Sequence, residues 1–101
     1  MIYFITAPTV GLVKIGYAKN PQARAVSIRS HSPVPIYLER VGTGSREEER
    51  ALHKRFQHLQ RHGEWFALNS EIRLVMRSFD KHEWRYRRGS EPADLRTGAA
   101  A

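Results

Sequence analysis

Two β-prone runs at the start of the chain predict a β-hairpin. Residues 1–7 and 12–18 are largely apolar, and the Pro-Thr-Val-Gly segment between them is typical of a turn. Side chains alternate between the faces of a strand. The residues of the second run are therefore divided between the two faces of the strand, with Val13, Ile15 and Tyr17 on one face and Lys14 and Gly16 on the other. A lysine beside a glycine suits close approach of an anion, and it equally suits an ordinary solvent face.

Capping residues and a proline-rich break set the next elements. Asn20 before Pro21 predicts a helix start, because the Asn side chain accepts from free backbone N–H groups and proline suits the first helical position. This helix should run to about Ser30. Three of its residues are available for packing: Ala23, Val26 and Ile28. Residues 35–42 (PIYLERVG) then predict a third strand.

The second half of the chain predicts two more helices. Ser45 and Glu48 fit a capping box. Apolar residues follow at helical spacing, namely Leu52, Phe56 and Leu59, until Gly63 ends the helix. Glu64-Trp65-Phe66 is expected to be a short buried segment. Asn69 or Ser70 caps a last helix whose inward residues are Ile72, Leu74, Val75, Met76 and Phe79.

The order β-β-α-β-α-α predicts an α+β (α/β) domain in residues 1–82, with a small three-stranded, mainly antiparallel sheet flanked by helices. Residues 83–101 are expected to be a disordered basic tail. Near its start, residues 81–88 interleave cations with Trp84 and Tyr86. Such a segment could grip phosphates and stack on bases, or it could be the frayed end of a basic helix.

Composition narrows the class of protein. The 101 residues suit one domain, and no run is long or apolar enough for a membrane span or a leader, so the cytoplasm is expected. The absence of cysteine excludes disulfides, thiolate zinc sites and cysteine nucleophiles. Seventeen Lys and Arg against ten Asp and Glu give a net charge of +7. Such a basic, arginine-rich chain favours a polyanionic partner, for which nucleic acid is the first candidate.

A set of motifs resembles the GIY-YIG nuclease superfamily, in particular its phage-associated branch. Met1-Ile2-Tyr3 is similar to the first motif, and Lys14-Ile15-Gly16, in the run KIGYAKNPQAR, is similar to the second. That run places Arg24 at the family arginine. The family's metal-binding glutamate corresponds to Glu49 in the run Glu49-Arg50-Ala51-Leu52-His53-Lys54. The closing GEWF segment (Gly63 to Phe66) resembles the phage-associated branch.

The resemblance implies Mg²⁺- or Mn²⁺-dependent hydrolysis of DNA phosphodiesters, with branched or single-stranded substrates left open. In that reading Glu49 holds the metal, Arg24 neutralises the phosphate, and Tyr3 orients or deprotonates water after cationic neighbours lower its pKa. These side chains and Lys14 should then converge on one concave surface. The residues expected to bind nucleic acid are Lys14, Tyr17, Lys19, Arg24 and Arg29.

Two positions depart from the family pattern. Lys14 replaces the second tyrosine, where an ammonium can bind phosphate but cannot act as a base. Ile28 stands where many members carry His or Tyr. Asn69 is a candidate for the late family asparagine without other support.

Each candidate also has an ordinary structural explanation. Tyr3 could be a packing residue, Lys14 and Arg24 surface charges, and Glu49 a first-turn acid that complements the helix dipole. His58 and His62 could offer zinc two imidazoles, but solvated histidines are favoured because no third ligand is evident. Glu64 is expected to pack rather than to act in catalysis. Besides an endonuclease, the sequence is compatible with a nucleic-acid-binding module that does not cut, or with a domain that binds an acidic protein.

Overall fold

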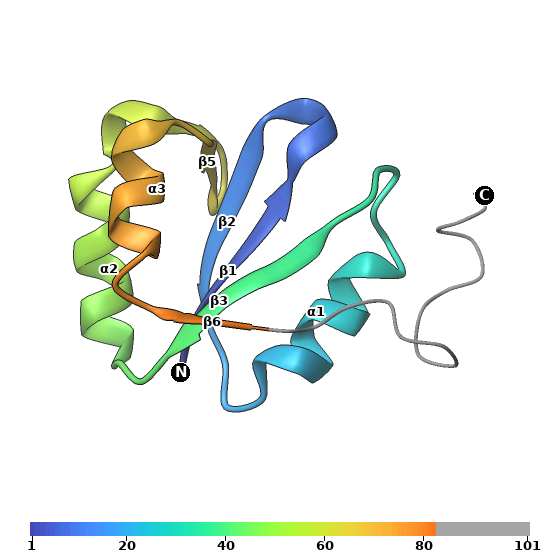
Figure 1. Cartoon of the computed structure of the whole chain (residues 1–101), viewed down its shortest axis with the longest axis horizontal. Helices are drawn as coiled ribbons and strands as arrows, with labels where there is room; N and C mark the ends of the chain where they lie inside the picture. The colour runs from blue at the N-terminus through green and yellow to red at the C-terminus, as the bar shows by residue number, and fades with distance from the viewer. Residues whose placement is uncertain (83–101) are drawn as a thin grey trace.

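The computed structural model describes residues 1–82, which form three α-helices and one antiparallel sheet of six strands (Figure 1). The strands lie in the order β4-β5-β2-β1-β3-β6. Their bounds are β1 (Ile2–Ala7), β2 (Leu12–Tyr17), β3 (Tyr37–Gly42), β4 (Gln60–His62), β5 (Trp65–Ala67) and β6 (Asp80–Lys81). The helices are α1 (Pro21–Arg29), α2 (Arg46–Arg55) and α3 (Ser70–Met76), with 3-10 turns η1 (Pro8–Val10) and η2 (Gln57–Leu59).

The expected three-stranded sheet is therefore wrong in extent, whereas the α+β class and the antiparallel pairing are confirmed. The three predicted strands, β1, β2 and β3, form the long centre of the sheet. The three strands that were not predicted have only two or three residues each. Strand β4 reads Gln-Arg-His and is exposed throughout, so it carries no alternation of apolar and polar residues that could reveal a strand.

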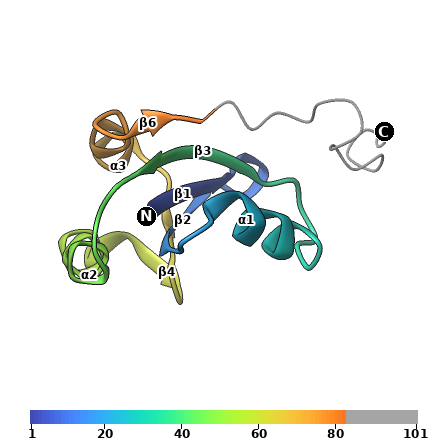
Figure 2. The same cartoon turned by 90° about the horizontal axis from the view of Figure 1, so that it is seen from below.

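Helices cover both faces of this sheet (Figure 2). Alternate residues of β1 point to opposite faces. Ile2 and Phe4 join the core beneath α2 and α3, whose other buried members are Val13, Ile15, Phe56, Phe66, Ile72 and Met76. Tyr3, Ile5 and Ala7 join a smaller core beneath α1, with Ala25, Ile36 and Leu38. The predicted facing of β2 is confirmed, because Val13, Ile15 and Tyr17 pack on the side of α2 and α3.

Helix starts were predicted better than helix ends. Asn20 caps α1, Ser45 and Glu48 form a reciprocal capping box on α2, and Asn69 caps α3. Helix α2 ends at Arg55 instead of reaching Gly63. His58 therefore lies in η2 and His62 in β4, so the two histidines do not share a helix face.

Several apolar residues do not pack as expected. Val26 is 43% exposed and Leu74 is 65% exposed, and Ala23 is also exposed. In α1 the alanine that enters the core is Ala25. These differences arise because α1 and α3 are short helices. Each packs only one narrow side against the sheet, so fewer apolar positions face inward.

The expectation of a disordered basic tail concerns residues 83–101, which lie outside the described residues. Within residues 1–82, no helix has the length and apolar character needed to cross a membrane.

Candidate active site

The candidate site forms where the sheet is incomplete beside β2. Strand β5 pairs with β2 only from Leu12 to Lys14. Beyond that point the backbone N–H of Ile15 donates to the carbonyl of Glu64 (3.2 Å), and the carbonyl of Ile15 accepts from Nε2 of His53 (2.8 Å). Since a carbonyl oxygen can only accept, Nε2 of His53 carries a proton. Side chains from both faces of the sheet can therefore meet at this edge.

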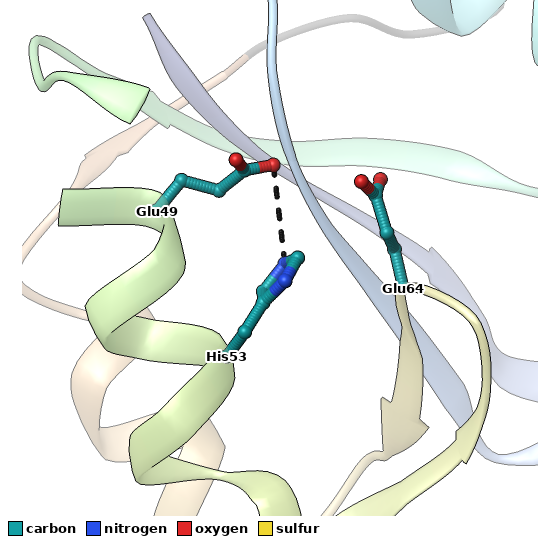
Figure 3. Close-up of side chains that lie close together, drawn as sticks. All are labelled: Glu49, His53 and Glu64. Carbon is teal, nitrogen blue, oxygen red and sulfur yellow. Dashed lines mark ion pairs between the residues drawn. The ribbon is translucent and has the colours of Figure 1, made fainter. Parts of the chain in front are cut away.

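Three potential metal ligands gather at this edge: Glu49, His53 and Glu64 (Figure 3). One ligand atom from each lies within 4.8 Å of the others. Glu49 and His53 are one turn apart on α2, with Oε2 of Glu49 3.9 Å from Nε2 of His53. Glu64 arrives from the turn between β4 and β5, where Gly63 adopts a φ of +56° that favours glycine.

The start of α2 explains why Glu49 points inward. The carboxylate of Glu48 accepts from the N–H of Ser45 (2.7 Å), and the Ser45 hydroxyl accepts from the N–H of Glu48 (3.1 Å). Glu48 thereby serves the helix cap and stays on the solvent side, as does Glu47. Glu49 is only 7% exposed. A buried carboxylate is costly without a partner, and the partner that α2 supplies is His53, one turn further along the helix.

Tyr3, Gly16 and Arg24 form a second group on the α1 side of the sheet. Tyr3 is opposite Gly16 in the β1–β2 pairing. A Cβ at position 16 would overlap the ring and hydroxyl of Tyr3, so only glycine lets the tyrosine lie across β2. Arg24, on the exposed side of α1, lies close enough for its guanidinium to favour the ionised form of Tyr3 and so to lower the pKa of that hydroxyl.

The electrostatics of Tyr3 correct one expectation from the sequence. Tyr3 is 1% exposed, and burial raises its pKa above the ordinary value of 10.0. Arg24 lowers the pKa, but the charges of Glu64 and Glu49 raise it, and the net shift is upward. A cationic neighbour, Arg24, does lower the pKa as expected, but the expected net lowering is wrong because burial outweighs it. Tyr3 is a neutral hydroxyl at neutral pH.

Lys14 and Glu64 connect the two groups. The ammonium of Lys14 lies 2.8 Å from Oε1 of Glu64. Lys14 shares its face of β2 with Gly16, next to Tyr3, whereas Glu64 belongs to the metal-ligand group. Glu49 reaches the edge from the α2 side, and its charge still acts on Tyr3. The four residues expected to act together thus lie around one end of β2, in two groups joined by the Lys14–Glu64 pair.

The other residues singled out from the sequence are spread more widely. Tyr17 packs on the opposite face from Lys14, beneath the guanidinium of Arg46 (4.7 Å to the ring centre). Lys19 is exposed just before α1, and Arg29 is half-buried at the end of that helix. Ile28 packs against the α1-side core. The side chain of Asn69 caps α3 by accepting from the N–H of Ile72 (3.0 Å), which gives it a structural role.

Sequence reasoning assigned no metal-binding role to His53 and expected Glu64 only to pack, whereas the structure brings both beside Glu49. His53 had a usable signal, because a residue four positions after Glu49 on a helix shares its face. Glu64 had a weaker one, its place in the GEWF segment. Nothing local showed that this segment returns beside β2, since that depends on pairing between residues about fifty positions apart.

The donor set is compatible with a hard divalent cation. Carboxylate oxygens suit Mg²⁺ and Mn²⁺, and imidazole is also a ligand for transition metals. Oxygen ligands on opposite sides of one Mg²⁺ are about 4.2 Å apart. A spread of at most 4.8 Å is therefore within reach of small side-chain rotations. Because Nε2 of His53 is already engaged, the carboxylates of Glu49 and Glu64 are the ligands that this arrangement leaves available.

Comparison with protein families places the chain in a known family. The sequence profile of the T5orf172 domain matches residues 1–85, and this domain is a GIY-YIG-like, nuclease-related domain. The chain therefore belongs to the T5orf172 domain family. Searches of curated proteins and of solved structures gave no match.

Proposed function

We propose that this protein is a metal-dependent endonuclease that hydrolyses DNA phosphodiester bonds at the end of β2. The observation that carries the proposal is the buried Glu49 beside His53 and Glu64, only one ion pair away from Lys14. A surface that merely binds nucleic acid has no need of a buried acidic group, because carboxylates repel phosphates. Membership of a nuclease-related family supports the same conclusion.

The residues divide the chemistry among them. Glu49 and Glu64 would hold Mg²⁺ or Mn²⁺, which when bound polarises a phosphate oxygen and stabilises the leaving 3′ oxygen. Arg24 keeps its charge at every working pH and can neutralise the non-bridging oxygens of the scissile phosphate. Lys14 supplies a second phosphate contact.

Tyr3 acts in its protonated form in this proposal. With a raised pKa, its hydroxyl stays protonated at neutral pH and positions the attacking water by hydrogen bonding, and the proton that this water releases on attack passes to bulk water. The mechanism then depends on geometry at Gly16, where the ring lies directly over the strand.

The decisive experiment incubates the full chain with supercoiled, linear, single-stranded and branched DNA in Mg²⁺, Mn²⁺ or EDTA. Wild type should cut at least one substrate only with a divalent ion. Glu49→Gln should lower the rate at least about 100-fold, since even the loss of groups that only support metal ligands costs 10- to 100-fold. It should also weaken Mn²⁺ binding measured calorimetrically. Glu47→Gln, an exposed neighbour on α2, is the matched control and should change neither.

A second candidate is a nucleic-acid-binding module that has this fold without the cutting activity. Lys14 favours it, because the position where the wider family has a second tyrosine is here an ammonium paired with Glu64. This candidate predicts no cleavage with any divalent ion, together with DNA binding that Glu49→Gln leaves unchanged. The absence of cleavage with every divalent ion contradicts the endonuclease proposal, whereas unchanged DNA binding by Glu49→Gln is compatible with both candidates.

A further inference from the structure

An apolar cleft of about 630 Å³ opens on the α1 side of the sheet, beside the proposed phosphate contacts. It is lined by Leu12 of β2, Ile28 of α1, Val34 of the loop between α1 and β3, and Trp65 of β5. The volume is within the range of small-ligand sites. None of these residues belongs to the metal-ligand group, so the cleft is a separate part of the surface.

Charge indicates what kind of ligand fits. Lys14 and Arg24, the two cations proposed to hold the phosphate, also line the cleft. Among the described residues, no acidic side chain lines it. An apolar cavity with cations at one side suits a flat, weakly polar group that is joined to an anion. A nucleobase attached to a phosphate has this chemistry.

Two rings and a cation lie at paired positions on three neighbouring strands. Trp65 is paired with His62 of β4 on one side and with Lys14 of β2 on the other. All three line the cleft, and Trp65 is only partly buried. His31, after α1, adds another ring to the lining. Base stacking on aromatic side chains is the common way to hold unpaired nucleotides.

The part of the lining that follows α1 is held by its own hydrogen bonds. The hydroxyl of Ser32 donates to the carbonyl of Val34 (2.6 Å) and accepts from its N–H (3.2 Å). The N–H of His31 donates to the carbonyl of Ile28 (3.0 Å). A wall that is already ordered loses little entropy when a ligand enters. The cleft is therefore formed before binding.

We propose that this cleft, the base cleft, receives an unstacked nucleobase from the nucleotide whose phosphate contacts Lys14 and Arg24. The inference rests on the proposed function for that phosphate position. A base can enter only after leaving its helical stack, which is least costly where it is already unpaired. The substrate class is thus single-stranded DNA, or an unpaired nucleotide at a branch, in preference to an uninterrupted duplex.

The test measures binding without hydrolysis. Fluorescence anisotropy in EDTA compares wild-type binding to a labelled oligothymidylate with binding to an abasic oligomer of the same length. Both have the same phosphates, so only base contacts differ. Wild type should bind the thymidylate about five- to a hundred-fold more tightly than the abasic oligomer, which is the gain in affinity expected from one stacked base. A duplex of that sequence should bind more weakly than the single strand.

Two variants test the location. Ser27→Trp fills the cleft from an exposed position on α1. It should bring the ratio of thymidylate affinity to abasic affinity towards one, while affinity for the abasic oligomer stays unchanged. Trp65→Ala, which removes the stacking platform, should have the same effect. Val26→Trp adds the same bulk at the next exposed residue, which does not line the cleft, and should keep the wild-type preference.

Several results would overturn the base cleft. These are equal wild-type affinity for the two oligomers, a preference that survives both cleft variants, and free thymidylate competing as well as the oligomer, which indicates a small-molecule ligand. The outcome is separable from that of the cleavage assay. If the protein never cuts DNA but prefers bases through the cleft, this inference stands and the endonuclease proposal fails. If the protein cuts DNA without that preference, the endonuclease proposal stands and this inference fails.

Discussion

The two faces of the sheet differ in how they are covered. Helices α2 and α3 seal one face with a core that contains Phe4, Phe56 and Phe66 at no more than 1% exposure. The other face has only α1, which buries just Pro21 and Ala25. Much of the free energy of folding should therefore come from the α2–α3 side, while the α1 side keeps an open cleft and an accessible arginine.

This difference separates two chemical tasks. Glu49 and His53 are fixed on α2, where the large core restrains the helix and hence the proposed metal ligand Glu49. Arg24 lies on the lightly packed α1, where a phosphate chain can approach. Glu64 joins the two sides through its ion pair with Lys14. The comparison predicts that stability and substrate contact respond to different substitutions.

The largest effect should come from removing the same side chain on each face. Ile72 of α3 is fully buried, whereas Ile28 of α1 is half-buried. Ile72→Ala should lower the free energy of unfolding by about 2–5 kcal/mol, and Ile28→Ala by about 1 kcal/mol, since less area and a smaller cavity are involved. Urea titrations followed by circular dichroism measure both. Equal losses would show that the faces contribute alike.

The next effect concerns the contact at the end of β2. Gly16→Ala should cost about 1–3 kcal/mol, because the added methyl overlaps the Tyr3 ring and forces a shift. In a Tyr3→Ala background the same change should cost much less. A double-mutant cycle measured by urea unfolding gives the coupling between the two positions. A coupling energy near zero would mean that the position of the Tyr3 ring does not require a glycine at position 16.

A smaller effect is expected for the residue that joins the two faces. Glu64→Gln frees Lys14, so single-stranded DNA should bind a few-fold more tightly in EDTA. The slope of log affinity against log salt should steepen by up to about 0.9, the value for one added phosphate contact. Mn²⁺ binding should weaken. Stability should change by less than about 1 kcal/mol, because the Glu64 side chain is 44% exposed.

Glu71→Gln is the matched control for this change. Glu71 is also partly exposed and pairs with His58 at 2.9 Å, away from β2. It should alter neither the salt slope nor Mn²⁺ binding. If both variants strengthen DNA binding equally, the effect is one of net charge and not of Lys14.

The smallest effect is the pH dependence that Tyr3 brings to stability. Its pKa is raised in the folded protein, mainly by burial, so the folded state holds this proton more tightly than the unfolded state. The contribution is fully present below about pH 10 and is lost as pH rises from there through the folded pKa. Tyr3→Phe should therefore lose less stability than wild type between pH 9 and about 11, as measured by urea unfolding. If Tyr3→Phe and wild type lose the same stability over this pH range, the titrating group is not Tyr3.

The parts of the fold with strong local signals could be predicted from the sequence. Alternation in β2 placed Lys14 and Gly16 on one face, and the capping box of Ser45 and Glu48 fixed where α2 begins. That start in turn decides which of the consecutive glutamates points inward. Such features depend on neighbouring residues only, which is why the sequence is sufficient for them.

The remaining parts depend on long-range pairing. Strands β4 and β5 have three residues each, and β6 has two, too few for a periodic pattern. The position of Glu64 follows from the pairing of β5 with β2. The direction of the Tyr3 pKa shift follows from burial beneath α1, together with carboxylates that reach it from two other elements. No local pattern contains this information.

The hydrogen bonds at Ile15 also have a consequence for solubility. Beyond Lys14, β2 is an edge strand, and an unpaired edge can recruit a strand from another molecule. The backbone of Glu64 and the imidazole of His53 occupy the N–H and the carbonyl of Ile15, so this edge offers no open ladder at that residue. The imidazole of His53 thus also protects the chain against self-association, and variants that remove this imidazole are expected to aggregate more readily.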